Sequence, residues 1–391
     1  MKIEKKNKSL KIAMLIRNYS PYGGGAERYC FELSKNLSEL HEVHIFCQTA
    51  QETLSGIHYH FIPKIFNRPR YINQLLFSFN TKKLTKSNFD IVHSHDMLTH
   101  ANIYTLHVQC FKTSLLKLKR IKRLFGYLGV LLSPRKISYL WLEKQEMKTI
   151  KNRYFIAVSN YLATNIIDNY PDVKDKILIS YPGIIPQPNK EIKKEKFKKK
   201  LEEKYGIKTG SLMLLFVAHG YKRKGLQNII YALEKLNNND ISLLVVGQGD
   251  KNEISFSSEE VQNRTFFLGL VKKMEEIYSA SDIFIHPTLG DTFAMSPLEA
   301  MSFKIPVIIS NKDYCGLTEQ LTNSEALILE DPKDFFEIAE KINLLQNDED
   351  FAKRIGSQGF KKSQSLSWSK TTESTLKAYE KITSQVENKK K

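Results

Sequence analysis

Cysteine, glycine, proline and long apolar runs are all scarce in this sequence of 391 residues. Its four cysteines form no Cys-x-x-Cys pair, which excludes a disulfide framework and suits a reducing cytoplasm. Gly (18) and Pro (12) are too few for a collagen or a low-complexity chain. The apolar stretch behind the basic N-terminus, 12–16, is shorter than the roughly 7–15 residues of a signal peptide, and no run approaches the ~20 residues of a membrane span. We therefore expect a cytoplasmic protein that is soluble or peripheral on a membrane.

Acidic residues are also scarce relative to basic residues. Lys and Arg total 59 against 42 Asp and Glu, which gives a formal net charge of +17. This balance favours an anionic partner, which could be a phosphate-bearing substrate, lipid headgroups or nucleic acid, and charge alone does not choose among them. The hydrophobic share of 41% and the length allow two or three domains, each with its own core.

Short apolar runs alternate with helical patterns along almost the whole chain. Continuous apolar strands separated by helices favour parallel sheets that are covered on both faces. Two series of runs fit two doubly wound α/β domains better than one very large sheet. The predicted strands are 11–17, 43–47, 90–93, 103–107, 154–158 and 177–181 in the first half, and 213–217, 243–246, 265–268, 282–286, 307–310 and 326–329 in the second.

A segment at 186–200, with two prolines and then many lysines, separates the two series. Such a composition is typical of a domain junction. We therefore expect an N-terminal domain over 1–187, a basic linker over 188–200 and a C-terminal domain over 201–372. A last helix and a basic tail would occupy 373–391.

A glycine loop, 23–25, follows the first strand and precedes a helical pattern. This order lets backbone N–H groups approach an anion at the helix N-terminus. A dinucleotide fingerprint would need a glycine where Arg28 stands and an acidic residue near the end of the second strand, where none occurs, so an NAD site is disfavoured. The loop either binds another anion, with Gly24 and Gly25 as candidates, or forms only a tight turn.

Three adjacent cations, Lys222, Arg223 and Lys224, follow the first strand of the second half. The carboxyl end of a parallel strand is where α/β folds bind ligands. Arg offers a planar fork for phosphate oxygens and Lys a point charge, so this loop is a candidate phosphate site. The alternative is a solvated basic turn.

Two acidic residues, Asp291 and Glu299, lie near the start of a later helical pattern. Ser296 as N-cap, Pro297 at the first helical position and Glu299 at the third would form a capping box, which would give Glu299 a structural role. Alternatively, Asp291 in the loop and Glu299 one turn into the helix face one cleft, where two carboxylates could hold sugar hydroxyls.

The stretch from Asp291 through Glu299 to Ala300-Met301 and a Pro-Val strand resembles the retaining glycosyltransferases of family 4. The similarity covers roughly residues 10–375 and is greatest to the lipopolysaccharide core glucosyltransferase branch. It implies an α/β fold of the GT-B type, with two Rossmann-like doubly wound parallel-sheet domains that face an interdomain cleft. The first would lie on the acceptor side and the second would bind the nucleotide sugar. Other landmarks follow in the family's order: the glycine loop, Asp90-Ile91-Val92-His93, Tyr104-Thr105-Leu106-His107, Ala157-Val158-Ser159-Asn160, Tyr181-Pro182-Gly183-Ile184 and Lys222-Arg223-Lys224-Gly225.

The resemblance also implies roles for single residues. Arg223 and Lys224 would stabilise the departing diphosphate, Asp291 and Glu299 would hold hydroxyls of the sugar and the ribose, and His107 would contact the donor sugar. Because the family is metal-independent, we expect no metal and no cofactor besides the nucleotide sugar, which is a co-substrate. The expected catalytic set is His107, Arg223, Lys224 and Asp291, and the expected nucleotide-sugar-binding set is Gly24, Gly25, Arg223, Lys224, Leu270, Asp291, Phe293, Ala294, Met295 and Glu299.

The chain departs from the family pattern at four positions. Asp291 stands for the usual Glu, so its carboxylate reaches one methylene less far. Ala294 and Lys304 replace glycines, and His219 stands where many members carry Arg. These departures bear most on which donor sugar is used.

His93, His95, Asp96 and His100 form a cluster in the sequence that could suggest a metal site. Their spacing fits no hydrolase ligand set well, and histidines at strand ends are more often structural. We therefore expect no metal there.

Residues 111–123 carry six cations and no acid, and their apolar residues recur at helical spacing. This pattern predicts a basic amphipathic helix with an apolar extension to 132. The helix either packs on its own domain or contacts an anionic inner-membrane surface, where each cation adds about 1 kcal/mol. An acceptor carried on a lipid at the inner face of the plasma membrane would explain the charge.

Together these observations predict a metal-independent hexosyltransferase that uses a UDP-sugar or GDP-sugar donor, with a UDP-sugar such as UDP-glucose favoured. The expected acceptor is a lipopolysaccharide core or another cell-envelope glycan. A capsular or exopolysaccharide mannosyl or GlcNAc transferase is the alternative, and a non-catalytic polyanion-binding protein or nucleotide-sugar sensor is a more distant one. Nucleic acid is not an expected partner, because the sequence has no aromatic-interleaved basic sheet, zinc-ligand spacing or recognition-helix pattern.

Overall fold

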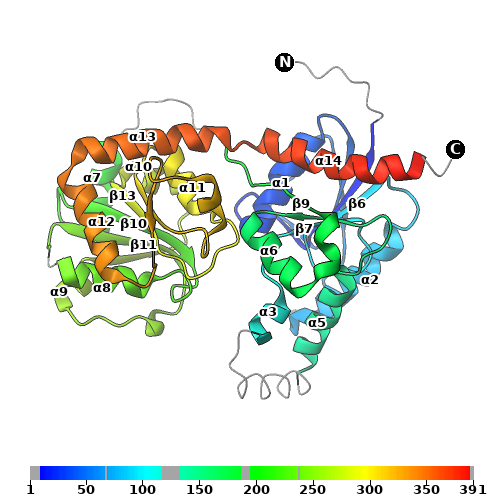
Figure 1. The fold of residues 1–391 in the computed structure, drawn as a ribbon, viewed down its shortest axis with the longest axis horizontal. Coiled ribbons are helices and arrows are strands. Elements are labelled where there is room, and N and C mark those ends of the chain that lie inside the picture. Colours follow the sequence, from blue (N-terminus) through cyan, green and yellow to red (C-terminus); the bar gives the residue numbers. More distant parts are fainter. Residues whose placement is uncertain (1–8, 67, 117–132, 186–193, 237, 388–391) are drawn as a thin grey trace. The chain divides into compact units, whose positions relative to one another are not determined.

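The computed structural model of the chain describes residues 9–66, 68–116, 133–185, 194–236 and 238–387. It divides into two compact units (Figure 1). Unit 1 comprises Met1–Gly183 with Trp368–Lys391, and unit 2 comprises Ile184–Ser367. Each unit holds one large parallel sheet with helices against it, as the alternation of strands and helices predicts.

Unit 1 is built on a seven-stranded sheet. Its strands are β1 (Lys11–Leu15), β3 (Glu42–Cys47), β5 (Ile57–Phe61), β6 (Ile91–Ser94), β7 (Ile103–Leu106), β8 (Tyr154–Ala157) and β9 (Ile177–Ile179). Their order is β5-β3-β1-β6-β7-β8-β9, and every neighbouring pair is parallel. A separate short pair joins β2 (Asn18–Tyr19) to β4 (Thr49–Ala50). The sheet reverses its winding between β1 and β6, which creates a switch point where such folds bind ligands.

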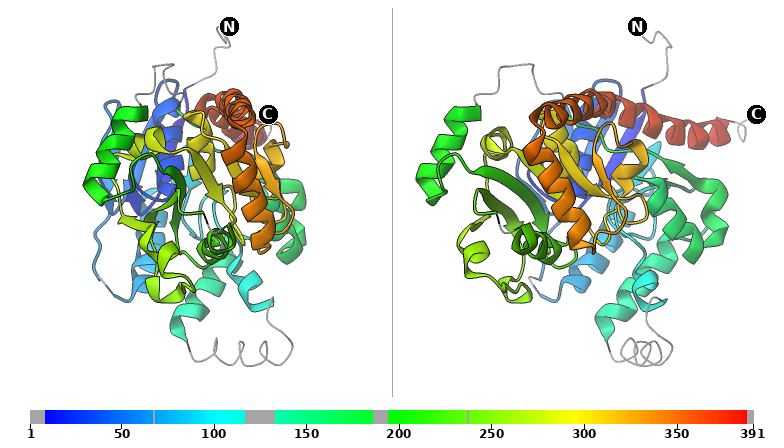
Figure 2. Two further views of the ribbon diagram at one scale, coloured as in Figure 1. Left: turned by 90° about the vertical axis from the view of Figure 1, so that its left-hand side faces the viewer. Right: turned by 60° about the vertical axis from the view of Figure 1, so that its left-hand side comes forward.

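Helices lie against both faces of this sheet (Figure 2). In α1, the buried Cys30, Leu33 and Leu37 recur at the spacing of one helix face, so burial of that face holds the helix in place. α1 packs against α14, the last helix of the chain. The helices of unit 1 are α1 (Gly25–Leu37), α2 (Arg70–Leu84), α3 (Phe111–Leu116), α5 (Pro134–Glu146), α6 (Asn160–Asn169) and α14 (Trp368–Glu387), with a 3-10 helix at Pro171–Lys176.

The strand β5 is not predicted from the sequence. Its residues alternate between apolar and histidine side chains, and it pairs with β3 at the edge of the sheet. An edge strand is buried less than a central one, so it lacks the continuous apolar run on which the sequence prediction depends.

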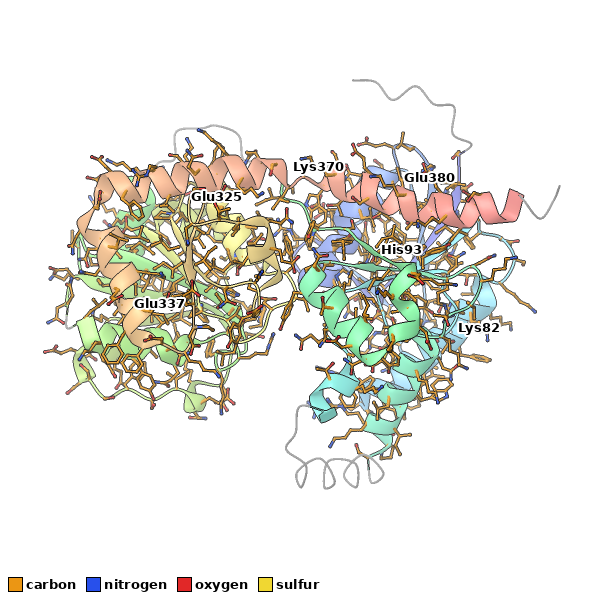
Figure 3. All side chains as sticks on the ribbon, viewed as in Figure 1. Lys82, His93, Glu325, Glu337, Lys370 and Glu380 are labelled. Atoms are coloured by element: carbon orange, nitrogen blue, oxygen red, sulfur yellow. The ribbon has the colours of Figure 1, made fainter. Side chains whose placement is uncertain are left out.

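The C-terminal helix α14 belongs to unit 1, where the sequence predicted a separate segment beginning at 373. The hydroxyl of Tyr379 lies 2.7 Å from Nδ1 of His93, which is labelled under this helix in Figure 3. The hydroxyl of Thr371 donates to the Tyr181 carbonyl at 2.7 Å. These buried polar contacts explain why the chain returns to its first unit.

Unit 2 is built on a six-stranded sheet, again parallel throughout. Its strands are β10 (Leu212–His219), β11 (Ile241–Gln248), β12 (Thr265–Gly269), β13 (Ile283–His286), β14 (Val307–Ser310) and β15 (Leu327–Leu329). The order β12-β11-β10-β13-β14-β15 reverses between β10 and β13. All six predicted strands of this half are present, because each is a short apolar run. β10, β11, β13 and β14 are largely buried, whereas β12, at the sheet edge, is mostly half-buried.

Helices pack in pairs on the sheet of unit 2. α8 packs on α12, α7 on α10 and α11 on α13. Their bounds are α7 (Lys194–Tyr205), α8 (Leu226–Leu236), α9 (Glu259–Asn263), α10 (Met274–Ala280), α11 (Met295–Ser302), α12 (Phe335–Asn347) and α13 (Glu349–Ser365), with 3-10 helices at Lys251–Glu253 and Gly316–Gln320.

The junction between the units differs from the predicted linker at 188–200. Residues 186–193 lie outside the described part of the chain, and α7 already begins at Lys194. Lys198 pairs with Asp282 at 3.0 Å and Lys200 with Glu276 at 2.7 Å. The predicted solvated charge run is therefore partly a helix of unit 2 that is paired with other residues of that unit. The boundary falls at 183/184 because Ile184 N donates to the Leu366 carbonyl at 2.8 Å.

No helix among the described residues is long and apolar enough to cross a membrane. Most of the predicted basic amphipathic helix and its extension, 117–132, lies outside the described residues, and α3 covers only 111–116.

Candidate active site

The loops after β10 and β13 come together where the strand order of unit 2 reverses. β10 and β13 are parallel neighbours, so both loops leave the sheet at its carboxyl edge. Gly225, at φ 82°, allows their close approach, because a Cβ there would lie 2.0 Å from the Pro287 carbonyl oxygen. The Leu289 N–H donates to the Arg223 carbonyl at 2.9 Å. The two loops are therefore fixed to each other through their backbones.

This arrangement brings Lys224 to Asp291, which is 67 residues away in the sequence. Lys224 Nζ donates to Asp291 Oδ2, and the two side chains are only 9% and 16% exposed. His286, the last residue of β13, places Nε2 3.1 Å from the same oxygen. The Asp291 backbone is held on both sides, because its N–H donates to the Tyr314 carbonyl at 2.8 Å and its carbonyl accepts from the Gly316 N–H at 3.1 Å.

The charge state of this cluster follows from its surroundings. Burial alone would raise the pKa of Asp291, but the Lys224 ammonium and the hydrogen bond from His286 hold that pKa well below its usual range. Burial lowers the pKa of His286, so its imidazole is neutral near pH 7 and donates from Nε2. Asp291 is therefore an ionised acceptor that is suited to hydroxyl groups. Sequence analysis assigned no role to His286, although a histidine at the end of a buried strand, five residues before the acid, was a usable signal.

Arg223 is placed differently from its neighbour Lys224. Its side chain is exposed, and Nη1 donates to the Gly290 carbonyl at 2.5 Å. A guanidinium carries five N–H donors, so this one contact orients the fork and leaves other donors for phosphate oxygens. A carbonyl does not neutralise the charge of Arg223, whereas Asp291 balances that of Lys224. Arg223 is therefore the stronger attractor for an anion in this loop.

The capping box predicted at Ser296 and Glu299 is wrong. α11 begins at Met295 with Ala294 in the N-cap position, so Ser296 lies inside the first turn. Its hydroxyl donates to the Val217 carbonyl at 3.1 Å and so ties the helix to β10. Glu299 accepts from the Tyr278 hydroxyl at 2.8 Å. Tyr278, to which sequence analysis gave no role, therefore orients this carboxylate.

Ala294 and Lys304, which replace family glycines, are the two non-glycine residues with positive φ in the described part of the chain. Their φ values are 73° and 61°, and they bracket α11. An L side chain at positive φ costs roughly 1–2 kcal/mol, because Cβ approaches the backbone. The backbone at these two positions thus keeps a conformation that suits glycine, although this chain has Ala and Lys where the family has glycine.

Other predicted residues of unit 2 lie around the same carboxyl edge. Phe293 is buried, and its carbonyl accepts from the Leu317 N–H at 2.8 Å. Met295 is half-buried, whereas Leu270, which follows β12, is 64% exposed. His219, at the end of β10, is exposed.

In unit 1, the glycine loop leads directly into α1, whose N-cap is Gly24. Gly23, Gly24 and Gly25 are exposed, and the first helical hydrogen bond runs from the Arg28 N–H to the Gly24 carbonyl at 3.1 Å. A Cβ on Gly24 would lie 2.9 Å from Oε2 of Glu27, the far end of a flexible side chain that could move aside. The N–H groups of a first turn lack intrahelical partners, which suits them to bind an anion.

His107 follows β7 and lies against two aromatic rings. Its Nε2 is 3.1 Å from Nδ1 of His95, and the Tyr29 ring packs edge-on at 5.1 Å between centroids. Burial lowers the pKa of His107 to about 3, against a raising effect of Asp96. The imidazole is therefore neutral near pH 7 and can exchange hydrogen bonds with hydroxyl groups without carrying charge.

His93 uses both ring nitrogens inside the fold. Nδ1 is 2.7 Å from the Tyr379 hydroxyl and Nε2 is 2.7 Å from the Thr105 hydroxyl. Asp96 is engaged by Arg17, whose Nη2 lies 2.9 Å from Oδ1. These contacts give both residues structural roles at the switch point of unit 1.

Comparison with protein families matches both halves of the chain. The family described as Glycosyltransferase Family 4 matches residues 23–187, and the family described as Glycosyl transferases group 1 matches residues 197–362. The first match contains the glycine loop and His107, and the second contains the Lys224–Asp291 pair.

Individual glycosyltransferases are also similar to this chain. An uncharacterized glycosyltransferase of Methanocaldococcus jannaschii is 24% identical over 388 residues, which are 95% of this chain and 98% of the relative. The capsular polysaccharide biosynthesis glycosyltransferase CapM of Staphylococcus aureus is 27% identical over 61% of this chain and 68% of its own length. The lipopolysaccharide glucosyltransferase WaaG of Escherichia coli K12 is 24% identical over 49% of this chain and 52% of its own length.

Solved structures show the same fold. WaaG, a glycosyltransferase involved in lipopolysaccharide biosynthesis, superposes with a TM-score of 0.76 at 18% identity and covers 95% of this chain and 99% of its own. HepE of Anabaena, in complex with UDP and glucose, gives a TM-score of 0.68 at 16% identity over 94% and 98% of the two chains. With both family matches and two parallel α/β units, the chain belongs to the family 4 glycosyltransferases of the GT-B fold.

Proposed function

We propose that this glycosyltransferase is a retaining, metal-independent hexosyltransferase that moves a sugar from a UDP-sugar to a lipopolysaccharide core or other cell-envelope glycan. The observation that carries the proposal is the cluster of Lys224, Asp291 and His286 at the switch point of unit 2, with the exposed Arg223 beside it. An ionised acceptor next to two cations is suited to a ligand that has hydroxyls close to a diphosphate. A nucleotide sugar has this chemistry.

The chemical step follows from the charges. The bond between the anomeric carbon and the diphosphate oxygen breaks, and a bond from the acceptor oxygen to the same face of that carbon forms. The acceptor proton passes to the departing phosphate, which carries the bonding electron pair. Arg223 and Lys224 stabilise the negative charge that develops on the leaving group, without a divalent ion or another cofactor.

The remaining site residues hold the donor in place. Asp291 binds hydroxyls of the transferred sugar, and Glu299, oriented by Tyr278, binds the ribose. The neutral His107 contacts the donor sugar. The backbone N–H groups of Gly24 and Gly25 bind the diphosphate. The loop residues that line the nucleotide-sugar position are Leu270, Phe293, Ala294 and Met295.

The acceptor side of the proposal involves a lipid surface. The predicted helix at 111–123, with its extension to 132, would hold the enzyme at the inner face of the plasma membrane through its cations. In its described start, Lys112 Nζ donates to the Asn169 carbonyl at 3.0 Å and lies 5.0 Å from the Tyr170 ring. Lys112 is therefore used within unit 1, and the membrane contact falls to the cations at 117–123.

The test is a donor panel. The purified full-length chain is incubated with UDP-glucose, UDP-galactose, UDP-GlcNAc and GDP-mannose, and nucleotide release and thermal stabilisation are measured with and without EDTA. We expect one UDP-hexose to give both signals, unaffected by EDTA. Loss of turnover in EDTA would contradict the metal-independent step. Release of the sugar first as its β-anomer from an α-linked donor would contradict a retaining mechanism.

A capsular or exopolysaccharide mannosyl or GlcNAc transferase is the second candidate, which the likeness to CapM favours. It predicts the strongest response with GDP-mannose or UDP-GlcNAc in the same panel. A response to double-stranded DNA at physiological salt, without any response to a nucleotide sugar, would point instead to a polyanion-binding protein.

A further inference from the structure

Three histidines and a glutamate lie together on β3 and β5 of unit 1. Glu42 and His44 are on β3, and His58 and His60 are on β5. The parallel register places His44 opposite His58. Because side chains alternate between the faces of a strand, the two residues from each strand share one face of the sheet. The four side chains therefore form one cluster at the sheet edge.

The cluster has the geometry of a metal site. The ligand atoms of Glu42, His44 and His58 all lie within 4.8 Å of one another. In a tetrahedral zinc site, bonds of about 2.0–2.2 Å place ligand atoms roughly 3.3 Å apart, so modest side-chain rotation closes the set. Two imidazoles and a carboxylate are donors that zinc accepts, whereas Mg²⁺ prefers oxygen ligands alone.

His44 is already oriented as a ligand. Its Nε2 lies 2.8 Å from Glu42 Oε1, and its Nδ1 lies 2.8 Å from His60 Nε2. His60 in turn stacks on Phe46 at 4.4 Å between ring centroids. A hydrogen bond to the second ring nitrogen is how proteins fix the orientation of a ligating histidine.

Two of the three candidate ligands are exposed and one is buried, so an ion can reach them from solvent. His44 is buried, while His58 and Glu42 are exposed. The His44 and His58 rings stack at 4.6 Å between centroids, so their nitrogens stay close before any ion binds. Lys11 Nζ lies 2.9 Å from Glu42 Oε1 and occupies the place of a cation beside that carboxylate.

We propose that Glu42, His44 and His58 bind one Zn²⁺ ion, with His60 as the residue that positions His44. The ion takes over from Lys11 as the partner of Glu42 and ties the edge strand β5 to β3. Glu42 and His58 lie near the amino ends of their strands, whereas the glycine loop and His107 follow carboxyl ends. The zinc site is thus separate from the donor-binding residues of unit 1 and acts on stability rather than on sugar transfer.

The test uses the full-length chain, freed of any affinity tag and treated with EDTA, with no nucleotide present. Zn²⁺ is titrated by calorimetry, and thermal unfolding is followed with and without the ion. We expect one Zn²⁺ per chain, a rise in Tm with Zn²⁺ and no effect of equimolar Mg²⁺. The absence of zinc binding to the unaltered chain would overturn the proposal.

Variants locate the site. His58→Ala removes an exposed ligand, so the protein should fold as before, and we expect zinc affinity to fall at least about tenfold and the Tm rise to vanish. His60→Ala should weaken binding by roughly 10–100-fold, the effect of losing an orienting partner. The matched control His219→Ala, an exposed histidine of unit 2, should bind zinc as the unaltered chain does. Equal zinc affinity in His58→Ala and in the control would contradict the assignment.

Discussion

The two units treat their site residues in opposite ways. In unit 2, Lys224 and Asp291 are both charged and compensate each other across a buried contact. In unit 1, His95 and His107 lie against each other, and burial keeps both rings neutral. Under the proposed function, this difference would let the cations of unit 2 stabilise the charge of a diphosphate, whereas His107 would offer a neutral hydrogen-bonding group.

Removing the cation Lys224 of unit 2 should have the largest effect on turnover. In Lys224→Ala, the developing charge on the leaving group loses a preorganised donor, and we expect turnover of the preferred donor to fall by roughly 10²–10³-fold. Asp291 also loses its partner, so thermal unfolding should shift downward. The matched control is Lys222→Ala, which removes an exposed cation from the same loop and should change turnover little. An equal loss of turnover in the two variants would mean that Lys224 contributes only to the net charge of the loop.

The role proposed for Glu299 of unit 2 is to bind the ribose. Replacing it with Ala removes hydrogen bonds to the ribose, and we expect UDP affinity measured by calorimetry to fall by about 10–100-fold, as for hydrogen bonds to a charged group. Tyr278→Phe keeps the carboxylate but removes its orienting hydroxyl, so the loss should be smaller. An unchanged affinity in Glu299→Ala would leave this residue with a purely structural role.

Acid should weaken the contribution of the buried histidines, in unit 1 and at His286 of unit 2, before it weakens that of Asp291. The pKa of His93 and that of His107 are lowered to about 3 in the folded state and are near 6.5 when unfolded, so the unfolded chain binds more protons between these values. Stability of unit 1 is therefore lost as pH falls below about 6.5. The pKa of Asp291 is depressed from its ordinary value, so its contribution is lost only as pH falls below about 4.

The two tryptophans make this measurable. Trp141 and Trp368 both belong to unit 1, so tryptophan fluorescence reports on that unit. We expect the urea midpoint followed by fluorescence to drop between pH 7.5 and 5.0. A midpoint that does not change over this interval would contradict the neutral state assigned to the buried histidines.

The smallest expected effect concerns the backbone around α11. Ala294→Gly relieves a positive φ but increases the freedom of the unfolded chain, so we expect a net gain of about 0.5–1 kcal/mol in the free energy of unfolding. Ala300→Gly, within α11, is the control and should destabilise by more than about 1 kcal/mol, because the loss of a buried methyl group adds to the helix-propensity cost. Both are read from chemical denaturation, and a destabilised Ala294→Gly would show that its methyl group contributes more by packing than it costs in strain.

The sequence predicts the strands well wherever they are continuous apolar runs, including the half-buried edge strands β9 and β12. All twelve predicted runs are strands of the two sheets, because parallel strands covered by helices leave a continuous apolar pattern. The strand β5, at the sheet edge, is missed because His58 and His60 interrupt its apolar run. Of these two histidines, His58 is a ligand of the proposed zinc site and His60 positions His44. The site depends on the cross-strand register of His44 and His58, which is not visible in local spacing.

The sequence identifies several candidate site residues, but it does not show which residues contact one another. The resemblance singles out Lys224 and Asp291 separately, yet their ion pair depends on the folding of two loops that are 67 residues apart. His286 and Tyr278 orient Asp291 and Glu299 from positions that carry no motif of their own. The predicted capping box is absent for a related reason. The Ser296 hydroxyl donates a hydrogen bond to the distant Val217 carbonyl instead of capping the helix.

The central claim is that Asp291 binds the sugar of the donor while the cations beside it bind the diphosphate. Calorimetry of UDP and of the preferred UDP-hexose with Asp291→Asn tests this most directly, because the substitution removes the charge and keeps the shape. The account predicts that affinity for the UDP-hexose falls to the level of UDP while affinity for UDP itself is retained. An unchanged affinity for the UDP-hexose, or an equal loss for both ligands, would contradict it.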